Sequence, residues 1–156
     1  MRKPIKQKNQ LEPDHRYNSL KVSQLINYVM RCGHKERAQN IVYKALDITK
    51  EKTKSKEALA VFEEAVNNVG PNMEVRSRRV GGANYQVPRE VSQKRRQALA
   101  LRWIVASARN KKGAPMYQKL AEEIIAASNK EGEAFTKREN THKMAEANKA
   151  FAHFAW

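Results

Sequence analysis

Residues 73–88 read MEVRSRRVGGANYQVP, and this stretch decides how the fold is interpreted. On both sides of Gly81-Gly82, apolar or small residues alternate with polar ones, and a period of two is typical of a β-strand,. Adjacent glycines supply the positive φ angles that tight hairpin turns need. Pro88 cannot donate a ladder hydrogen bond, so we expect it to end the second strand. The sequence therefore predicts one β-hairpin over residues 73–88.

Outside this stretch, apolar residues recur at the spacing of amphipathic helices. In the first such run they stand at positions 22, 25, 26 and 29, on one helix face,. We expect Ser19 to cap this helix and Gly33 to end it. The six expected helices lie, in chain order, at about 19–32, 35–48, 55–69, 92–109, 115–131 and 133–149, with a charged linker at 50–56.

The two ends of the chain differ from its middle. Residues 1–13 are polar and basic, with prolines at positions 4 and 13, which predicts an extended arm,. Residues 150–156 form an aromatic tail. A length of 156 residues without internal repeats fits one domain,. The predicted fold class is therefore mainly α: a single six-helix domain over residues 1–156, with one protruding β-hairpin and a basic N-terminal arm.

The charge of the chain indicates a polyanionic partner. It carries 31 Lys and Arg against 16 Asp and Glu, a net charge of +15. Residues 1–119 hold 26 of these cations and 10 of the anions, a net of +16, whereas residues 120–156 have a net of −1. Self-repulsion destabilises so basic a domain unless an anion neutralises it, and nucleic acid is the usual anion. No apolar run approaches the roughly 18 residues of a membrane span, so we expect a cytoplasmic protein with no membrane partner.

Two clusters of cations are candidates for RNA contact. Arg76, Arg78 and Arg79 lie within four residues on the first hairpin strand, and arginine binds phosphate through a fixed fork of donors,. On the fourth helix Arg95, Arg102 and Arg109 repeat every seven residues and form a basic stripe,. The remaining candidate contacts are Arg2, Lys3, Lys94, Arg96 and Lys111. The alternative is that these charges only keep a hairpin and a helix face soluble.

The sequence offers no catalytic or metal-binding constellation. Cys32 and His34 have no second ligand pair at zinc spacing, and a phosphate loop or a Ser/His/Asp set is missing,. Glu122 and Glu123 are adjacent on a helix and are expected to be solvated. Trp103 is expected in the core. We therefore predict a protein that is not an enzyme and uses neither a cofactor nor a metal.

The aromatic tail suggests a different partner from that of the basic clusters. Phe151, Phe154 and Trp156, with Tyr85 on the return strand of the hairpin, are candidates for contact with another protein or with tRNA,. The alternative is that the tail packs back on the core of its own domain.

Four stretches together resemble the bacterial-type small-subunit ribosomal protein seven family over nearly the whole chain. They are RYNSLKVSQLINYVMRCGHKERAQNIVYKAL at 16–46, VRSRRVGGANYQVP at 75–88, RRQALALRWIVASAR at 95–109 and KRENTHKMAEANKAFAHFAW at 137–156. Agreement in the expected order over this length is far more specific than a short motif.

The resemblance implies a helical bundle with a projecting hairpin and a role in the small ribosomal subunit. It implies direct binding to the 3′ major domain of the small-subunit rRNA, nucleation of head assembly, and a place at the subunit interface near exit-site tRNA and mRNA. The implied protein neighbours are small-subunit proteins nine and eleven, and some family members repress their own mRNA. Transferred to this sequence, the basic arm, the hairpin and the fourth helix would face rRNA.

Two other functions compete with this interpretation. A helix-turn-helix transcription factor fits the first two helices, joined near Gly33, but the basic residues gather elsewhere and no dimerisation seam is evident,. An RNA-modifying enzyme fits the charge but lacks catalytic residues. Co-sedimentation with ribosomal subunits or with nucleoid DNA would separate the ribosomal protein from the transcription factor.

Overall fold

A computed structural model describes residues 11–53 and 57–154 of the chain. In these residues six α-helices, one 3₁₀ helix and one antiparallel hairpin follow one another. The elements are α1 (Leu20–Val29), α2 (Lys35–Thr53), α3 (Ala58–Val69), β1 (Met73–Val80), β2 (Ala83–Glu90), α4 (Gln93–Asn110), α5 (Met116–Ser128), α6 (Glu133–Ala147) and η1 (Lys149–Phe154). The predicted mainly α fold with one hairpin is confirmed.

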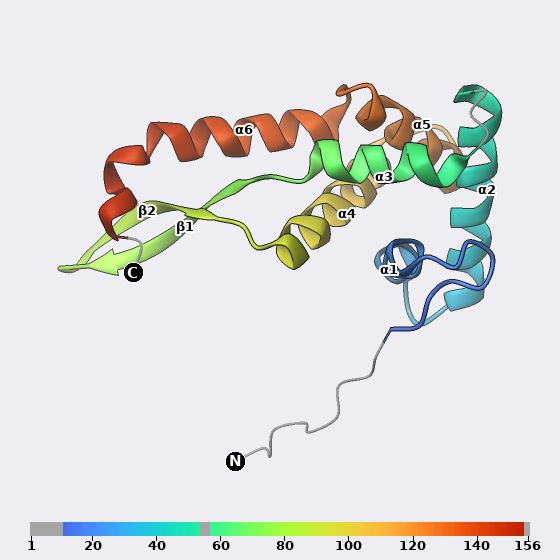
Figure 1. The fold of residues 1–156 in the computed structure, drawn as a ribbon, viewed down its shortest axis with the longest axis horizontal. Coiled ribbons are helices and arrows are strands. Elements are labelled where there is room, and N and C mark those ends of the chain that lie inside the picture. The colour runs from blue at the N-terminus through green and yellow to red at the C-terminus, as the bar shows by residue number, and fades with distance from the viewer. Residues whose placement is uncertain (1–10, 54–56, 155–156) are drawn as a thin grey trace, which may run out of the picture.

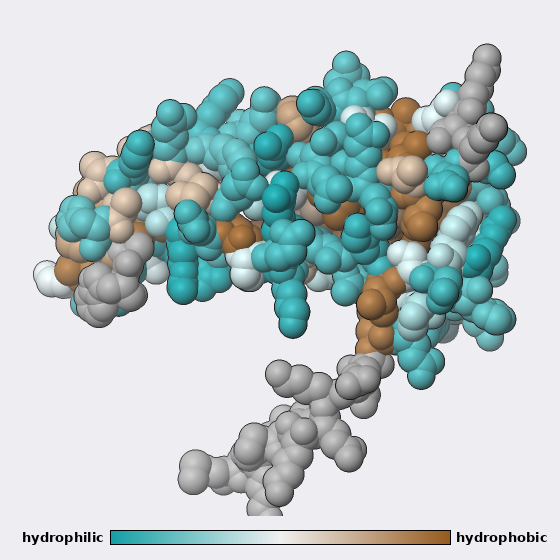
Figure 2. All heavy atoms as spheres, viewed as in Figure 1, coloured by the Kyte–Doolittle hydropathy of each residue, from teal (hydrophilic) through white to brown (hydrophobic). Residues whose placement is uncertain are grey.

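The core of the molecule lies around α5, which packs against α2, α3 and α4. Phe62, Ile104 and Ile124 are fully buried there, and Trp103 joins them as predicted. In contrast, α6 packs along both strands, so helix and hairpin extend side by side away from the bundle (Figure 1). On the face drawn in Figure 2, hydrophilic side chains cover most of the surface. No helix of the described residues is both long and apolar enough to cross a membrane.

The hairpin is longer than predicted, because β2 continues past Pro88 to Glu90. Pro88 is the register partner of Val75 and is buried. A two-stranded sheet has only edge strands, so the missing N–H of a proline can face away from the partner strand without breaking the ladder.

Two helix ends also differ from the prediction. The first helix ends at Val29 and not at Gly33, because residues 30–34 form a turn in which Cys32 and Gly33 both have positive φ. The second helix runs to Thr53, through most of the expected linker. There the hydroxyl of Thr49 donates to the carbonyl of Ala45, so the helix continues around a buried polar group. Ser55, the expected start of the third helix, lies outside the described residues.

Candidate nucleic-acid interface

The two predicted basic clusters meet at one carboxylate, that of Glu74 on β1. Arg76 Nε donates to Glu74 Oε1 at 2.7 Å. From the first turn of α4, Arg95 Nε donates to the same oxygen at 2.8 Å and to Oε2 at 2.7 Å. The side chain of Glu74 is only 11% exposed, whereas those of Arg76 and Arg95 are 49% and 45% exposed. The hairpin and α4 therefore present one continuous guanidinium surface over a buried anion.

The electrostatics of this cluster keep Glu74 ionised. Burial by itself raises the pKa of the Glu74 carboxyl, but the hydrogen bonds from Arg95 and Arg76 outweigh it and lower the pKa below its ordinary value,. The carboxylate thus stays charged and offsets the repulsion between the two guanidinium groups.

The other hairpin arginines point in different directions. Arg78 Nη1 donates to the carbonyl of Phe154 at 2.8 Å, so this side chain ties the hairpin to η1. Arg79 is exposed, and its position in the strand places it on the opposite face from Arg76 and Arg78,. The structure therefore divides the three arginines between two faces of the hairpin, as their spacing predicts.

Several cations on and beside α4 have partners inside the protein. Arg96 donates to the carbonyls of Gly70 and Asn67 at the end of α3, both at 3.2 Å. An added Cβ at Gly70 would lie 2.8 Å from the Arg96 side chain, so only glycine permits this approach. Lys111 Nζ lies 2.8 Å from a carboxylate oxygen of Glu123. These two cations bind carbonyl or carboxylate groups of the fold itself.

Arg109 has a similar role at the end of α1. It donates to the carbonyls of Tyr28 at 2.9 Å and Val29 at 3.2 Å, which are among the groups that a helix leaves unpaired at its C-terminus,. Desolvation, with a smaller contribution from nearby Arg31, lowers the pKa of Arg109. The three arginines spaced seven residues apart on α4 therefore differ in their contacts. Arg95 contacts the hairpin, Arg109 contacts α1, and Arg102 is exposed between them. Lys94 is likewise exposed.

The expectation that Glu122 and Glu123 are both solvated is wrong for Glu123. Its side chain is fully buried, and besides Lys111 it accepts a hydrogen bond from the backbone N of Ala134 at 2.9 Å. Adjacent helix residues point about 100° apart, so one faces solvent while the other faces the start of α6.

Sequence reasoning missed a basic-rimmed cleft beside Arg109. It has a volume of about 380 Å³ and lies where the turn after α1 meets α2 and the start of α5. Ile41 and Met116 contribute apolar surface, and Arg31, Arg37 and Lys119 contribute cations. The closeness of Arg31 and Arg37 in the sequence was the only available signal. Such a cleft suits a nucleotide with its base against apolar side chains and its phosphate against arginine.

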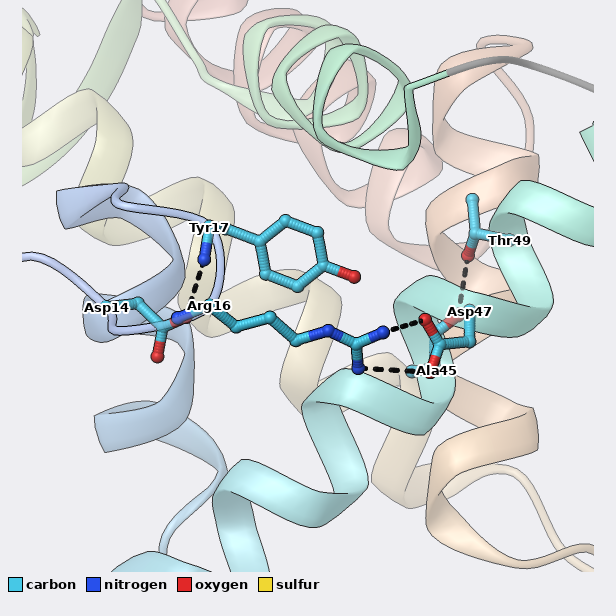
Figure 3. A network of polar contacts seen from close by, with 6 residues as sticks. All are labelled: Asp14, Arg16, Tyr17, Ala45, Asp47 and Thr49. Carbon is cyan, nitrogen blue, oxygen red and sulfur yellow. Dashed lines mark hydrogen bonds and ion pairs between the residues drawn. The ribbon is translucent and has the colours of Figure 1, made fainter.

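A second feature that was not predicted from the sequence is the attachment of residues 14–17 to α2. Arg16 makes two hydrogen bonds with Asp47 on α2, at 2.8 and 3.1 Å, and its guanidinium lies 5.4 Å from the ring centres of both Tyr17 and Tyr43. Asp14 accepts from the backbone N of Arg16 and Tyr17 (Figure 3). Arg2 and Lys3, the predicted contacts of the arm, lie outside the described residues.

The aromatic tail packs on the hairpin and not on the bundle core. The ring centres of Phe151 and Phe154 lie 5.3 and 5.1 Å from that of Tyr85, and both side chains are half-buried. In Figure 1 η1 turns down from the end of α6 onto the strands. Trp156 is outside the described residues. The two expectations for the tail were contact with another protein or tRNA and packing on the core of the domain. Neither included this contact with the hairpin.

Comparison with known proteins shows the family of the chain. The family model described as "Ribosomal protein S7p/S5e" matches residues 1–149. The chain belongs to this family. It is 59% identical over 156 residues to "Small ribosomal subunit protein uS7" of Thermotoga maritima, covering 100% of both chains. Proteins of the same name are 56% identical in a Thermoanaerobacter species and 53% identical in Rhodopirellula baltica, covering 99% and 96% of each chain.

Family membership confirms the resemblance stated from the sequence. It makes the chain a ribosomal protein, and therefore a component of a ribonucleoprotein that works in translation. RNA binding is typical of such a family, which accounts for the net charge of +15,.

Proposed function

We propose that the protein is a structural constituent of the small ribosomal subunit in the bacterial cytoplasm, and that it binds the 3′ major domain of the small-subunit rRNA directly. The names of its relatives support the location in the small ribosomal subunit. The observation that carries rRNA binding is the junction at Glu74, where arginines from β1 and α4 form one exposed cationic surface. By holding rRNA helices against arm, hairpin and α4, the protein nucleates assembly of the head of the subunit.

The mechanism is electrostatic and depends on shape. Arginine and lysine side chains displace counterions from crowded phosphates, and this term supplies most of the affinity without base readout. A hairpin and a helix meeting at a fixed angle would hold two RNA segments in a defined geometry. Three exposed cations make no hydrogen bond within the part of the chain that the structure describes: Lys94, Arg79 and Arg102. These three side chains are candidate phosphate contacts.

Other contacts of the proposal use the aromatic residues near the tip of the same hairpin. The hairpin tip and η1 form an aromatic cluster of Tyr85, Phe151 and Phe154, with Trp156 following in the chain. We assign this end to exit-site tRNA, the mRNA path or a neighbouring protein, with small-subunit proteins nine and eleven as the expected neighbours. Repression of its own mRNA would use the same basic surface, since an mRNA that mimics the rRNA site would compete for it.

A binding experiment with matched RNAs tests the proposal. The protein is titrated against transcripts of the 3′ major domain and of the 5′ domain, at equal salt. Replacing Arg79 and Arg102 with alanine removes two exposed contacts, each contributing roughly 1.5–3 kcal/mol, and should weaken binding to the first transcript. The control replaces Lys137 and Lys143, exposed on α6, and should change binding little. Equal affinity for both transcripts would contradict the assignment.

A further inference from the structure

We propose that Glu74 is a positioning residue for RNA binding, which holds Arg76 and Arg95 as a preformed pair of guanidinium forks for one backbone phosphate. This inference rests on the proposed function and adds an acidic residue to a binding surface otherwise made of cations. An acidic side chain beside RNA would ordinarily oppose binding, because like charges repel. The geometry at Glu74 indicates the opposite effect.

Glu74 binds only one kind of nitrogen atom in the two arginines. Both arginines donate to the carboxylate through Nε alone, at 2.7–2.8 Å. Within residues 11–53 and 57–154, the terminal Nη atoms of Arg76 and Arg95 make no hydrogen bond. The end of each guanidinium, with two parallel N–H donors, is therefore available, and this edge matches two oxygens of a phosphate.

Glu74 is also buried beneath the two arginines. The Glu74 side chain is only 11% exposed, while each arginine side chain is almost half exposed. A phosphate arriving from solvent would thus meet the guanidinium groups and not the anion behind them. Because both Nε atoms share the oxygen Oε1, the two forks are held next to each other.

Holding two cations together costs free energy unless an anion lies between them. Without the carboxylate, the two guanidinium groups would repel and their long side chains would sample many rotamers, which a phosphate would have to reorder on binding. Glu74 removes both costs before RNA arrives. The two arginines come from different elements, and β2 leads directly into α4 (Figure 1), so the same contact also fixes the hairpin base against the helix.

The decisive test is a substitution for which net charge and arginine positioning predict opposite changes in RNA affinity. Glu74→Gln removes one negative charge and turns an amide N–H₂ toward Arg95 Nε, donor against donor. If charge alone governed binding, this variant would bind the 3′ major-domain transcript as tightly as the wild type or more tightly. The positioning role predicts binding weaker by about tenfold, the loss of one good charge-assisted contact. The slope of log K against log salt should also become shallower by about one phosphate contact.

The matched control is Glu90→Gln, the same charge change at an exposed position on β2. It should leave affinity equal to the wild type or slightly higher. Melting temperatures of both variants show whether the fold is kept. Affinity of the Glu74→Gln protein at or above that of Glu90→Gln would overturn the proposal.

A second variant tests the positioning role of Glu74 if the Glu74→Gln protein does not fold. Arg95→Lys keeps the charge and can still pair with Glu74, but its ammonium is then used internally and no fork remains. It should weaken binding about tenfold relative to Arg89→Lys, an exposed control on the strand opposite Glu74,. Equal affinity of these two lysine variants would contradict the positioning role. Failure of the wild-type protein to bind the transcript would instead contradict the proposed function itself.

Discussion

Glu123 on α5 and Lys111, just beyond the end of α4, form an ion pair of 2.8 Å in which the glutamate is fully buried. The other carboxylate oxygen accepts a hydrogen bond from the backbone N of Ala134, in the first turn of α6. One side chain thus joins α5, the end of α4 and the start of α6. This contact holds the start of α6 against α5 and the end of α4.

Replacement of Glu123 with alanine should therefore destabilise the protein. The variant leaves the buried Ala134 N–H without its acceptor, which costs about 1–3 kcal/mol, while the one-third exposed Lys111 can turn to solvent,. Urea denaturation measures the free energy of unfolding. Glu122→Ala, an exposed neighbour on the same helix, should stay within about 0.5 kcal/mol of the wild type,. Similar stabilities of the two variants would show that this contact does not stabilise the fold.

Tyr43 should titrate at unusually high pH. Its hydroxyl donates to Asp14 Oδ1 at 2.8 Å, and burial, followed by this hydrogen bond, raises the pKa of Tyr43 to about 12. A raised pKa in the folded state stabilises the fold fully below the ordinary value of about 10, and this stabilisation is lost as pH rises through about 12,. Phenolate absorbance of the wild type and Tyr43→Phe, compared during alkaline titration, checks the assignment. Loss of a component titrating near 10 would contradict it.

Deletion of residues 150–156 should loosen the hairpin and leave the helical bundle folded. It removes Phe151 and Phe154 from Tyr85 and takes away the carbonyl that Arg78 binds. Amide hydrogen exchange should become faster in β1 and β2, while α3 and α5 keep their protection. The double variant Phe151→Ala, Phe154→Ala separates the rings from the backbone contact. Unchanged exchange in the hairpin after the deletion would mean that the tail does not support it.

Local patterns predicted most of the fold. The alternation around Gly81-Gly82 and the helical spacing of apolar residues act within one element, so the sequence shows them directly. The sequence does not show that the first helix ends at Val29, before the positive-φ turn at Cys32 and Gly33, nor that Arg109, 80 residues away, binds the carbonyls at this end. A distant side chain leaves no mark on the local sequence.

The candidate site was predicted as a set of residue types and not as an arrangement. Both basic clusters were recognised, yet nothing in the sequence paired Glu74 with Arg95, which lies 21 positions further along. The solvated position expected for Glu123 failed for a related reason, because the N-terminus of α6 covers that side of α5. Charge counts along a chain therefore indicate a candidate RNA-binding surface but do not say which of its cations bind groups of the protein itself.

The salt dependence of binding to the 3′ major-domain transcript tests the central claim most directly. With a net charge of +16 in residues 1–119, we expect about 6–10 phosphates to be neutralised,. The logarithm of affinity should then fall linearly with the logarithm of salt concentration, by about 10³–10⁵-fold between 50 and 200 mM. A steep line of this kind, with tighter binding than to the 5′ domain, is the predicted result. An affinity that hardly changes over the same range would contradict an electrostatic rRNA-binding mechanism.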